Sequence, residues 1–182
     1  MDSQKYKKEL RNKTLKLLKK FTGSQRIQAE KNLQKQLILS SEWQQAKCVA
    51  LTISLPFEIN TSKLITQAWK EQKQVAIPVT QNDRQMNFYQ ITPQTSWRIS
   101  QFGIKEPINA RLLVKEAIDL MIVPGIVYNK SGYRIGFGKG FYDRYLANFY
   151  GHTASLVFSF QVNNTWSPQA FDQKVQKLYI GE

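Results

Sequence analysis

The chain has 182 residues, 42% of them hydrophobic, which is long and apolar enough for one folded domain over residues 1–182. No apolar run reaches about 18 residues and the N-terminus is polar, so we expect no transmembrane helix, signal peptide or membrane partner. The single cysteine, Cys48, excludes an internal disulfide. A reduced, cytoplasmic location is therefore the default expectation.

Positive charge is concentrated at the N-terminal end of the chain. Residues 1–35 hold 11 of the 26 basic residues and three acidic ones, so they carry +8 of the net +13. This concentration favours either binding of a nucleic acid or capture of a polyanionic small molecule. The alternative is a solvated helix face without a partner. The chain shows no known nucleic-acid motif, which counts against the first of these interpretations.

Hydrophobic spacing predicts helices alternating with short strands. Leucines at helical spacing, Leu17 among them, predict a helix over residues 3–20, and Ser24 is expected to cap a second helix to about Leu39. The further elements, in chain order, are a strand at 48–54, a helix from Thr61 or Ser62 to about 73, strands at 75–79 and 86–92, a helix at 110–117, a strand at 119–123, a helix at 139–150 and a strand at 154–160.

The predicted strands are continuously apolar and separated by helices. This pattern is typical of an α/β fold whose mostly parallel sheet is covered on both faces. In such folds ligands bind beyond the carboxyl ends of the strands. Three candidate site segments follow predicted strands, namely residues 54–58, the residues after Pro78, and the glycine-rich stretch after Val123. We expect them to lie at one edge of the sheet.

Residues 136–140 read Gly-Phe-Gly-Lys-Gly, directly before a predicted helix. The spacing differs from a Walker A loop and from the dinucleotide fingerprint G-x-G-x-x-G. Glycines nevertheless let the backbone approach a ligand closely, and the amides at a helix start attract anions. The stretch therefore favours a phosphate site, and the alternative is a flexible connection that needs positive φ angles.

Three charged residues accompany the glycines. Lys139 could neutralise phosphate oxygens as a mobile point charge, or lie solvated at the helix start. Arg134 could bind a phosphate through two nitrogens. Asp143 could hold Mg²⁺ together with phosphate oxygens, although acidic residues are also favoured in a first helical turn by the helix dipole alone.

The remaining candidates are less specific. Glu58, at a strand end, could bind a polar substrate edge or be an ordinary loop acid. Trp97 and Phe102 lie in a predicted loop, where they could stack on a flat heterocycle or cover the core. His152 is the only histidine and is expected to be structural, and Cys48 is expected to be a core residue. One histidine and one cysteine form neither a Ser-His-Asp set nor a Cys/His zinc cluster.

Three motifs together resemble a known family. They are VPGIVYNKSGYRIGFGKGFYDRYL from Val123 to Leu146, the loop Gly103-Ile104-x-Glu106-Pro107, and Lys7-x-x-Leu10-Arg11 followed by the turn from Ser54 to Glu58. Their residues, order and spacing resemble the 5-formyltetrahydrofolate cyclo-ligases over essentially the whole chain. The resemblance implies a three-layer α/β/α fold with a mostly parallel central sheet, related to sugar-phosphate isomerases and CoA transferases.

The resemblance also implies a reaction. ATP and Mg²⁺ drive the conversion of 5-formyltetrahydrofolate, with or without a polyglutamate tail, to 5,10-methenyltetrahydrofolate, with release of ADP and phosphate. The formyl oxygen attacks the γ-phosphate, and N10 then closes the ring as phosphate leaves. Such chemistry requires positioning and charge neutralisation rather than a histidine or cysteine nucleophile.

Site residues follow from the resemblance by position, with Lys139 and Arg134 as the catalytic pair and Asp143 and Asp172 as the metal ligands. Relative to the family pattern, Phe141 replaces a tyrosine, Phe171 a histidine and Gln176 an acid. The implied ATP-binding residues are Lys7, Arg11, Arg134, Ile135, Gly136, Phe137, Gly138, Lys139, Gly140, Phe141 and Tyr142. The implied folate-binding residues are Ile53, Glu58, Trp97, Phe137, Gly138, Lys139, Gly140 and Phe141.

Two other functions stay open at this point. A basic nucleic-acid-binding protein would use residues 1–35 and lose affinity steeply with salt. A sugar-phosphate isomerase of related fold would need a general base and no ATP. We expect the ligase, acting on a small molecule without a nucleic-acid partner, as a monomer, with a dimer as the alternative.

Overall fold

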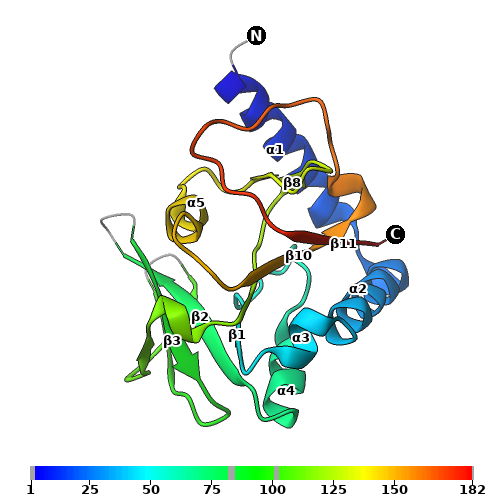
Figure 1. Cartoon of the computed structure of the whole chain (residues 1–182). Helices are drawn as coiled ribbons and strands as arrows, with labels where there is room; N and C mark the ends of the chain where they lie inside the picture. Colours follow the sequence, from blue (N-terminus) through cyan, green and yellow to red (C-terminus); the bar gives the residue numbers. More distant parts are fainter. Residues whose placement is uncertain (1–2, 82–84, 101–102, 182) are drawn as a thin grey trace.

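In the computed structural model, which describes residues 3–81, 85–100 and 103–181, seven strands form the central sheet (Figure 1). Their spatial order is β11 (Lys177–Gly181), β10 (His152–Phe158), β7 (Leu120–Ile122), β1 (Cys48–Ala50), β2 (Gln74–Thr80), β3 (Met86–Ile91) and β6 (Leu112–Leu113). The first five of these strands are parallel, whereas β3 and β6 are antiparallel to their neighbours. The predicted mostly parallel sheet is confirmed.

Helices cover both faces of the sheet (Figure 1). On one face α2 packs against β10 and β11, and α4 packs against β2, while α5 packs near β3 on the other face. The α-helices are α1 (Ser3–Lys20), α2 (Gly23–Ile38), α3 (Ser41–Gln45), α4 (Ser62–Lys70) and α5 (Phe141–Leu146), and two short 3-10 helices are η1 (Lys115–Ala117) and η2 (Ser159–Gln161).

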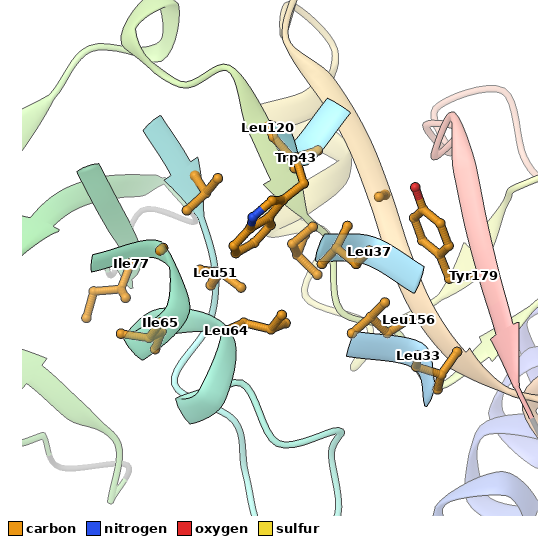
Figure 2. Close-up of a cluster of buried hydrophobic side chains, with 14 of the residues drawn as sticks. Leu33, Leu37, Trp43, Leu51, Leu64, Ile65, Ile77, Leu120, Leu156 and Tyr179 are labelled. Atoms are coloured by element: carbon orange, nitrogen blue, oxygen red, sulfur yellow. The ribbon is translucent and has the colours of Figure 1, made fainter. Parts of the chain in front are cut away.

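The core is divided by the sheet into two hydrophobic clusters. Successive residues of β1 and β7 point to opposite faces, so Val49 joins the cluster under α2 and α4, while Ala50 joins the one under α5. The larger cluster surrounds the fully buried Trp43 (Figure 2), whose indole Nε1 donates to Glu71 Oε2 at 2.8 Å. Burial on both faces explains why the central strands read as continuous apolar runs.

Two small ribbons lie outside the main sheet. Strand β4 (Trp97–Ile99) pairs with β5 (Lys105–Pro107), and β8 (Val127–Tyr128) pairs with β9 (Arg134–Ile135), both antiparallel. The second ribbon follows β7 in the chain, and the glycine stretch comes directly after its strand β9. The sequence predicted a loop around Trp97, but Trp97 begins strand β4. Phe102 lies outside the described residues.

The predicted helix over 110–117 is wrong. The chain there forms β6 and then the turn η1, because Leu112 and Leu113 pair with Tyr89 and Phe88 of β3. Edge pairing to an antiparallel neighbour thus overrides local helical propensity.

Other boundaries differ in smaller ways. The second helix begins at Gly23 after an N-cap at Thr22, so Ser24 does not cap it. The predicted strand at 48–54 ends as a strand at Ala50. Of the leucines that predicted the first helix, Leu18 is buried, whereas Leu17 is 42% exposed. None of the helices in the described part of the chain is both long enough and apolar enough to span a membrane.

Candidate active site

The glycine stretch forms a tight turn between β9 and α5. Gly138 and Gly140 have φ angles of 90° and 71°, which other residues rarely adopt. Gly140 is the N-cap residue of α5, so the helix begins at residue 141 and not at the predicted 139. Lys139 is exposed between these two glycines, and Arg144 Nη1 donates to its carbonyl at 2.9 Å.

Helix α1 holds this turn through Arg11. Arg11 Nε donates to the Gly136 carbonyl at 2.7 Å. The guanidinium also lies against Gly138, where an added Cβ would meet Nη2 at 3.2 Å. Burial lowers the pKa of Arg11 below its usual value, but a guanidinium in a protein stays charged. A permanent positive charge therefore lies beside the glycine amides, as the phosphate interpretation requires.

One helical turn earlier, Lys7 meets the segment that precedes β11. Lys7 Nζ lies 2.7 Å from Asp172 Oδ2 and 5.0 Å from the ring centre of Trp166. The same Asp172 oxygen accepts a hydrogen bond from Gln169 N at 2.8 Å. Figure 1 shows α1 and this segment side by side at one end of the molecule. Lys7 and Arg11 thus face one region of the protein from successive turns of α1.

Arg134 joins three segments around the same region. Its Nη2 lies 3.2 Å from Asp143 Oδ1, and its Nη1 donates to the Gln173 carbonyl at 2.9 Å. Its charged group is also 5.8 Å from the ring centre of Tyr142. Arg134 is only 6% exposed, and both terminal nitrogens contact protein groups. Arg134 thus links α5 to the segment before β11, and its contact with phosphate stays a prediction.

The two candidate metal ligands are brought into the same neighbourhood. Gln173 N donates to Asp143 Oδ1 at 3.1 Å, and Gln173 directly follows Asp172. In the described ranges no group of three or more His, Cys, Asp or Glu side chains could hold a metal ion. Mg²⁺ commonly uses one or two carboxylates and takes its other ligands from water and substrate phosphates, so two acids beside a phosphate site fit it.

A cavity of about 50 Å³ lies beyond the carboxyl ends of β1 and β7. Its wall carries one acid, Glu58, whose Oε2 accepts a hydrogen bond from Leu55 N at 2.8 Å. Burial raises the pKa of Glu58. The wall further includes Leu18, Thr52, Phe57, Pro124, Tyr128 and Gln161.

Aromatic side chains connect this cavity with the glycine turn. Phe57 of the cavity wall contacts Phe137 of the turn edge to face, with ring centres 6.2 Å apart. Ile53 and Trp97, both candidate folate contacts, are half-buried against the core and do not line the cavity. Phe137 of the glycine turn thus lies against the segment that carries Glu58.

Sequence reasoning missed several residues of this region. Gln161 donates to the Ile126 carbonyl at 3.1 Å and accepts from Phe158 N, fixing one cavity wall. Trp166 lies under Lys7, and Arg26 donates to the Glu58 carbonyl. These residues lie in separate segments of the sequence, and no local motif marks them.

Comparison with known proteins agrees with this geometry. The model of the 5-formyltetrahydrofolate cyclo-ligase family matches residues 3–179. The chain is 34% identical to the 5-formyltetrahydrofolate cyclo-ligase of Haemophilus influenzae over 152 residues, covering 81% of each chain. It is 27% identical to that of Mus musculus over 187 residues, covering 94% of this chain and 92% of the relative.

Solved structures give the same result. The 5,10-methenyltetrahydrofolate synthetase of Aquifex aeolicus superposes with a TM-score of 0.84 at 29% identity, covering 96% of this chain and 89% of that one. The synthetase of Mycoplasma pneumoniae, 20% identical, shares the fold with a TM-score of 0.79 over 98% of both chains. The predicted fold class and the resemblance are confirmed, and among the functions left open the ATP-dependent ligase is supported. The chain belongs to the 5-formyltetrahydrofolate cyclo-ligase family.

Proposed function

We propose that this protein cyclises 5-formyltetrahydrofolate to 5,10-methenyltetrahydrofolate with ATP and Mg²⁺, through a phosphorylated formyl group. The formyl oxygen attacks the γ-phosphorus and ADP leaves. N10 then attacks the formyl carbon and loses its proton, and the carbon–oxygen bond breaks to release phosphate. Phosphorylation is required because the oxygen of a formamide is otherwise a poor leaving group.

The observation that carries this proposal is the meeting of α1 with the glycine turn. Arg11 contacts Gly136 and Gly138, and Lys139 projects from the same turn. These two cations and the turn amides supply the charge neutralisation on which phosphoryl transfer depends. Lys7 would add a third cation once its contact with Asp172 is exchanged for phosphate. Mg²⁺, held by Asp143 and Asp172, would further neutralise the phosphate oxygens.

The cavity is the proposed folate site. Glu58 offers a carboxylate to N–H groups on the edge of the two-ring heterocycle, and apolar wall residues face its flat surfaces. A volume of about 50 Å³ holds only a few water molecules. The cavity therefore has to widen for the ring to enter, and we propose that the contact between Phe57 and Phe137 opens. Phe137 links this movement to the glycine turn that carries Lys139.

The test is a rise in the absorbance of methenyltetrahydrofolate when the protein is mixed with 5-formyltetrahydrofolate, ATP and Mg²⁺. We expect the rise only when all three are present, and chelation of Mg²⁺ with EDTA should abolish it. Product formation without ATP would contradict the phosphorylated intermediate. Folded protein that leaves the substrate unchanged would overturn the proposal.

A further inference from the structure

The C-terminal end of α1 forms one side of the cavity. Leu18 lines the cavity, and the next residue, Lys19, holds its ammonium 5.8 Å from the ring centre of Phe57 on the cavity wall. Arg26 fixes this arrangement, because its Nη1 donates to the Leu18 carbonyl and its Nη2 to the Glu58 carbonyl. Lys19 therefore has a defined place at the entrance, although its side chain is exposed.

Arg26 and Lys19 differ in whether an acidic side chain neutralises their charge. Arg26 Nε lies 2.9 Å from Glu30 Oε1, so that guanidinium is neutralised within the protein. Lys19 takes part in none of the ion pairs found among the described residues. A cation without a carboxylate partner beside a cavity is available to a ligand, and the ligand group that it favours is an anion.

The proposed substrate has such a group. One end of 5-formyltetrahydrofolate is a two-ring heterocycle, and the other is a glutamate with two carboxylates, joined through a flat aminobenzoyl group. With the heterocycle toward Glu58, the glutamate stays at the mouth. Phe57 offers an aromatic face to the aminobenzoyl group there.

Resting on the proposed function, we infer that Lys19 is a specificity-determining residue that binds the glutamate carboxylates of the substrate. It acts on affinity and not on chemistry, because it lies at the cavity mouth and belongs to neither the glycine turn nor its contacts with α1. An exposed ion pair of this kind changes affinity by about two- to fivefold.

The experiment compares two substrates, 5-formyltetrahydrofolate and 5-formyltetrahydropteroate, which lacks the glutamate. Lys19→Met keeps an apolar stem over Phe57 and removes the charge, and Lys19→Arg keeps the charge. The matched control is Lys20→Met, an exposed lysine that is rotated by about 100° around the same helix. KM and kcat are measured for each variant at low and at high salt.

We expect Lys19→Met to raise KM for the glutamate-bearing substrate about two- to fivefold, with kcat unchanged and KM for the pteroate unaffected. Lys19→Arg should restore the native KM, and high salt should reduce the difference between Lys19→Met and the native chain. Equal KM increases for both substrates would show a packing role and overturn the inference, as would no change or an equal effect of Lys20→Met. An inactive native chain would instead overturn the proposed function, and this inference with it.

Discussion

Lys7 and Asp172 are separated by 165 positions in the chain, yet their side chains form an ion pair of 2.7 Å that is 12% and 10% exposed. The pair links α1 to the segment before β11. Both of its members are candidate ligand-binding residues, so the contact combines a structural role with a place in the proposed phosphate site.

Removal of the Lys7 charge is expected to destabilise the fold. Lys7→Met leaves the Asp172 carboxylate largely buried without its cation, which should lower the free energy of unfolding by about 2–4 kcal/mol. Urea denaturation measures the loss, and Lys8→Met, an exposed neighbour, is the control. The double variant with Asp172→Asn should lose less than the sum of the single variants. Equal stability of the two methionine variants would show that the ion pair contributes nothing.

Lys139 is expected to act on turnover and not on stability. It is exposed between two glycines, so Lys139→Ala should leave the melting temperature unchanged. Loss of a cation from the transferring phosphate should lower kcat at least about tenfold. Steady-state rates at saturating ATP test this, with the exposed Lys130→Ala as control. An unchanged rate would remove Lys139 from the phosphate site.

The glycine turn offers a matched pair of substitutions. Gly140 has a φ of 71°, and an added Cβ would lie 2.9 Å from Arg144 Nη1, so Gly140→Ala should destabilise the protein by about 1–2 kcal/mol and reduce turnover. Gly136 has open space and no positive φ, so Gly136→Ala should be tolerated by the fold. The melting temperatures and turnover rates of the two variants test this difference. Equal behaviour of the two would argue against a strained turn.

Glu58 is expected to make stability depend on pH. Burial raises its folded-state pKa above 4.5, so its contribution to stability is fully present below 4.5 and is lost as the pH rises through the raised value. Glu58→Gln keeps an acceptor for Leu55 N–H and removes the buried charge. Its melting temperature should exceed that of the native chain at about pH 7 and equal it near pH 4, while folate turnover falls. An unchanged stability profile would show that Glu58 is ionised without penalty.

The Mg²⁺ dependence of activity shows which of the two candidate metal ligands, Asp143 and Asp172, binds the metal. Asp143→Asn keeps an acceptor for Gln173 N but weakens the charge at the metal, so we expect the Mg²⁺ concentration for half-maximal activity to rise at least about tenfold. Tryptophan fluorescence on Mg²⁺-dependent ATP binding gives a second readout. Asp172→Asn is compared directly, with the exposed Glu116→Gln as control. The acid whose variant keeps the native Mg²⁺ requirement is not a metal ligand.

Local sequence predicted the elements whose apolar residues recur at a regular spacing. The strand at β3 and the helix α1 match their predicted spans closely, because apolar spacing alone defines them. The strand β11 was not predicted, because it is short, partly exposed and held by parallel pairing with β10. The local preferences of residues do not predict which distant segments pair.

The same limit applies to the site. The glycines on either side of Lys139 predicted the turn, because glycine is the residue favoured where the backbone needs a positive φ. The phosphate contact of Arg134 stays a prediction, and the sequence did not show that its two terminal nitrogens contact Asp143 and the Gln173 carbonyl. The direction in which an arginine beside a glycine turn points depends on tertiary contacts. For the same reason Trp166 under Lys7 carried no signal.

The contact between Lys7 and Asp172 also bears on how the protein is made. Lys7 is synthesised 165 positions before Asp172. During translation the lysine therefore lacks its acidic partner until the segment before β11 has left the ribosome. We expect a nascent chain that still lacks the region after η2 to bind no nucleotide, because the Lys7–Asp172 contact that links α1 to this region is then absent.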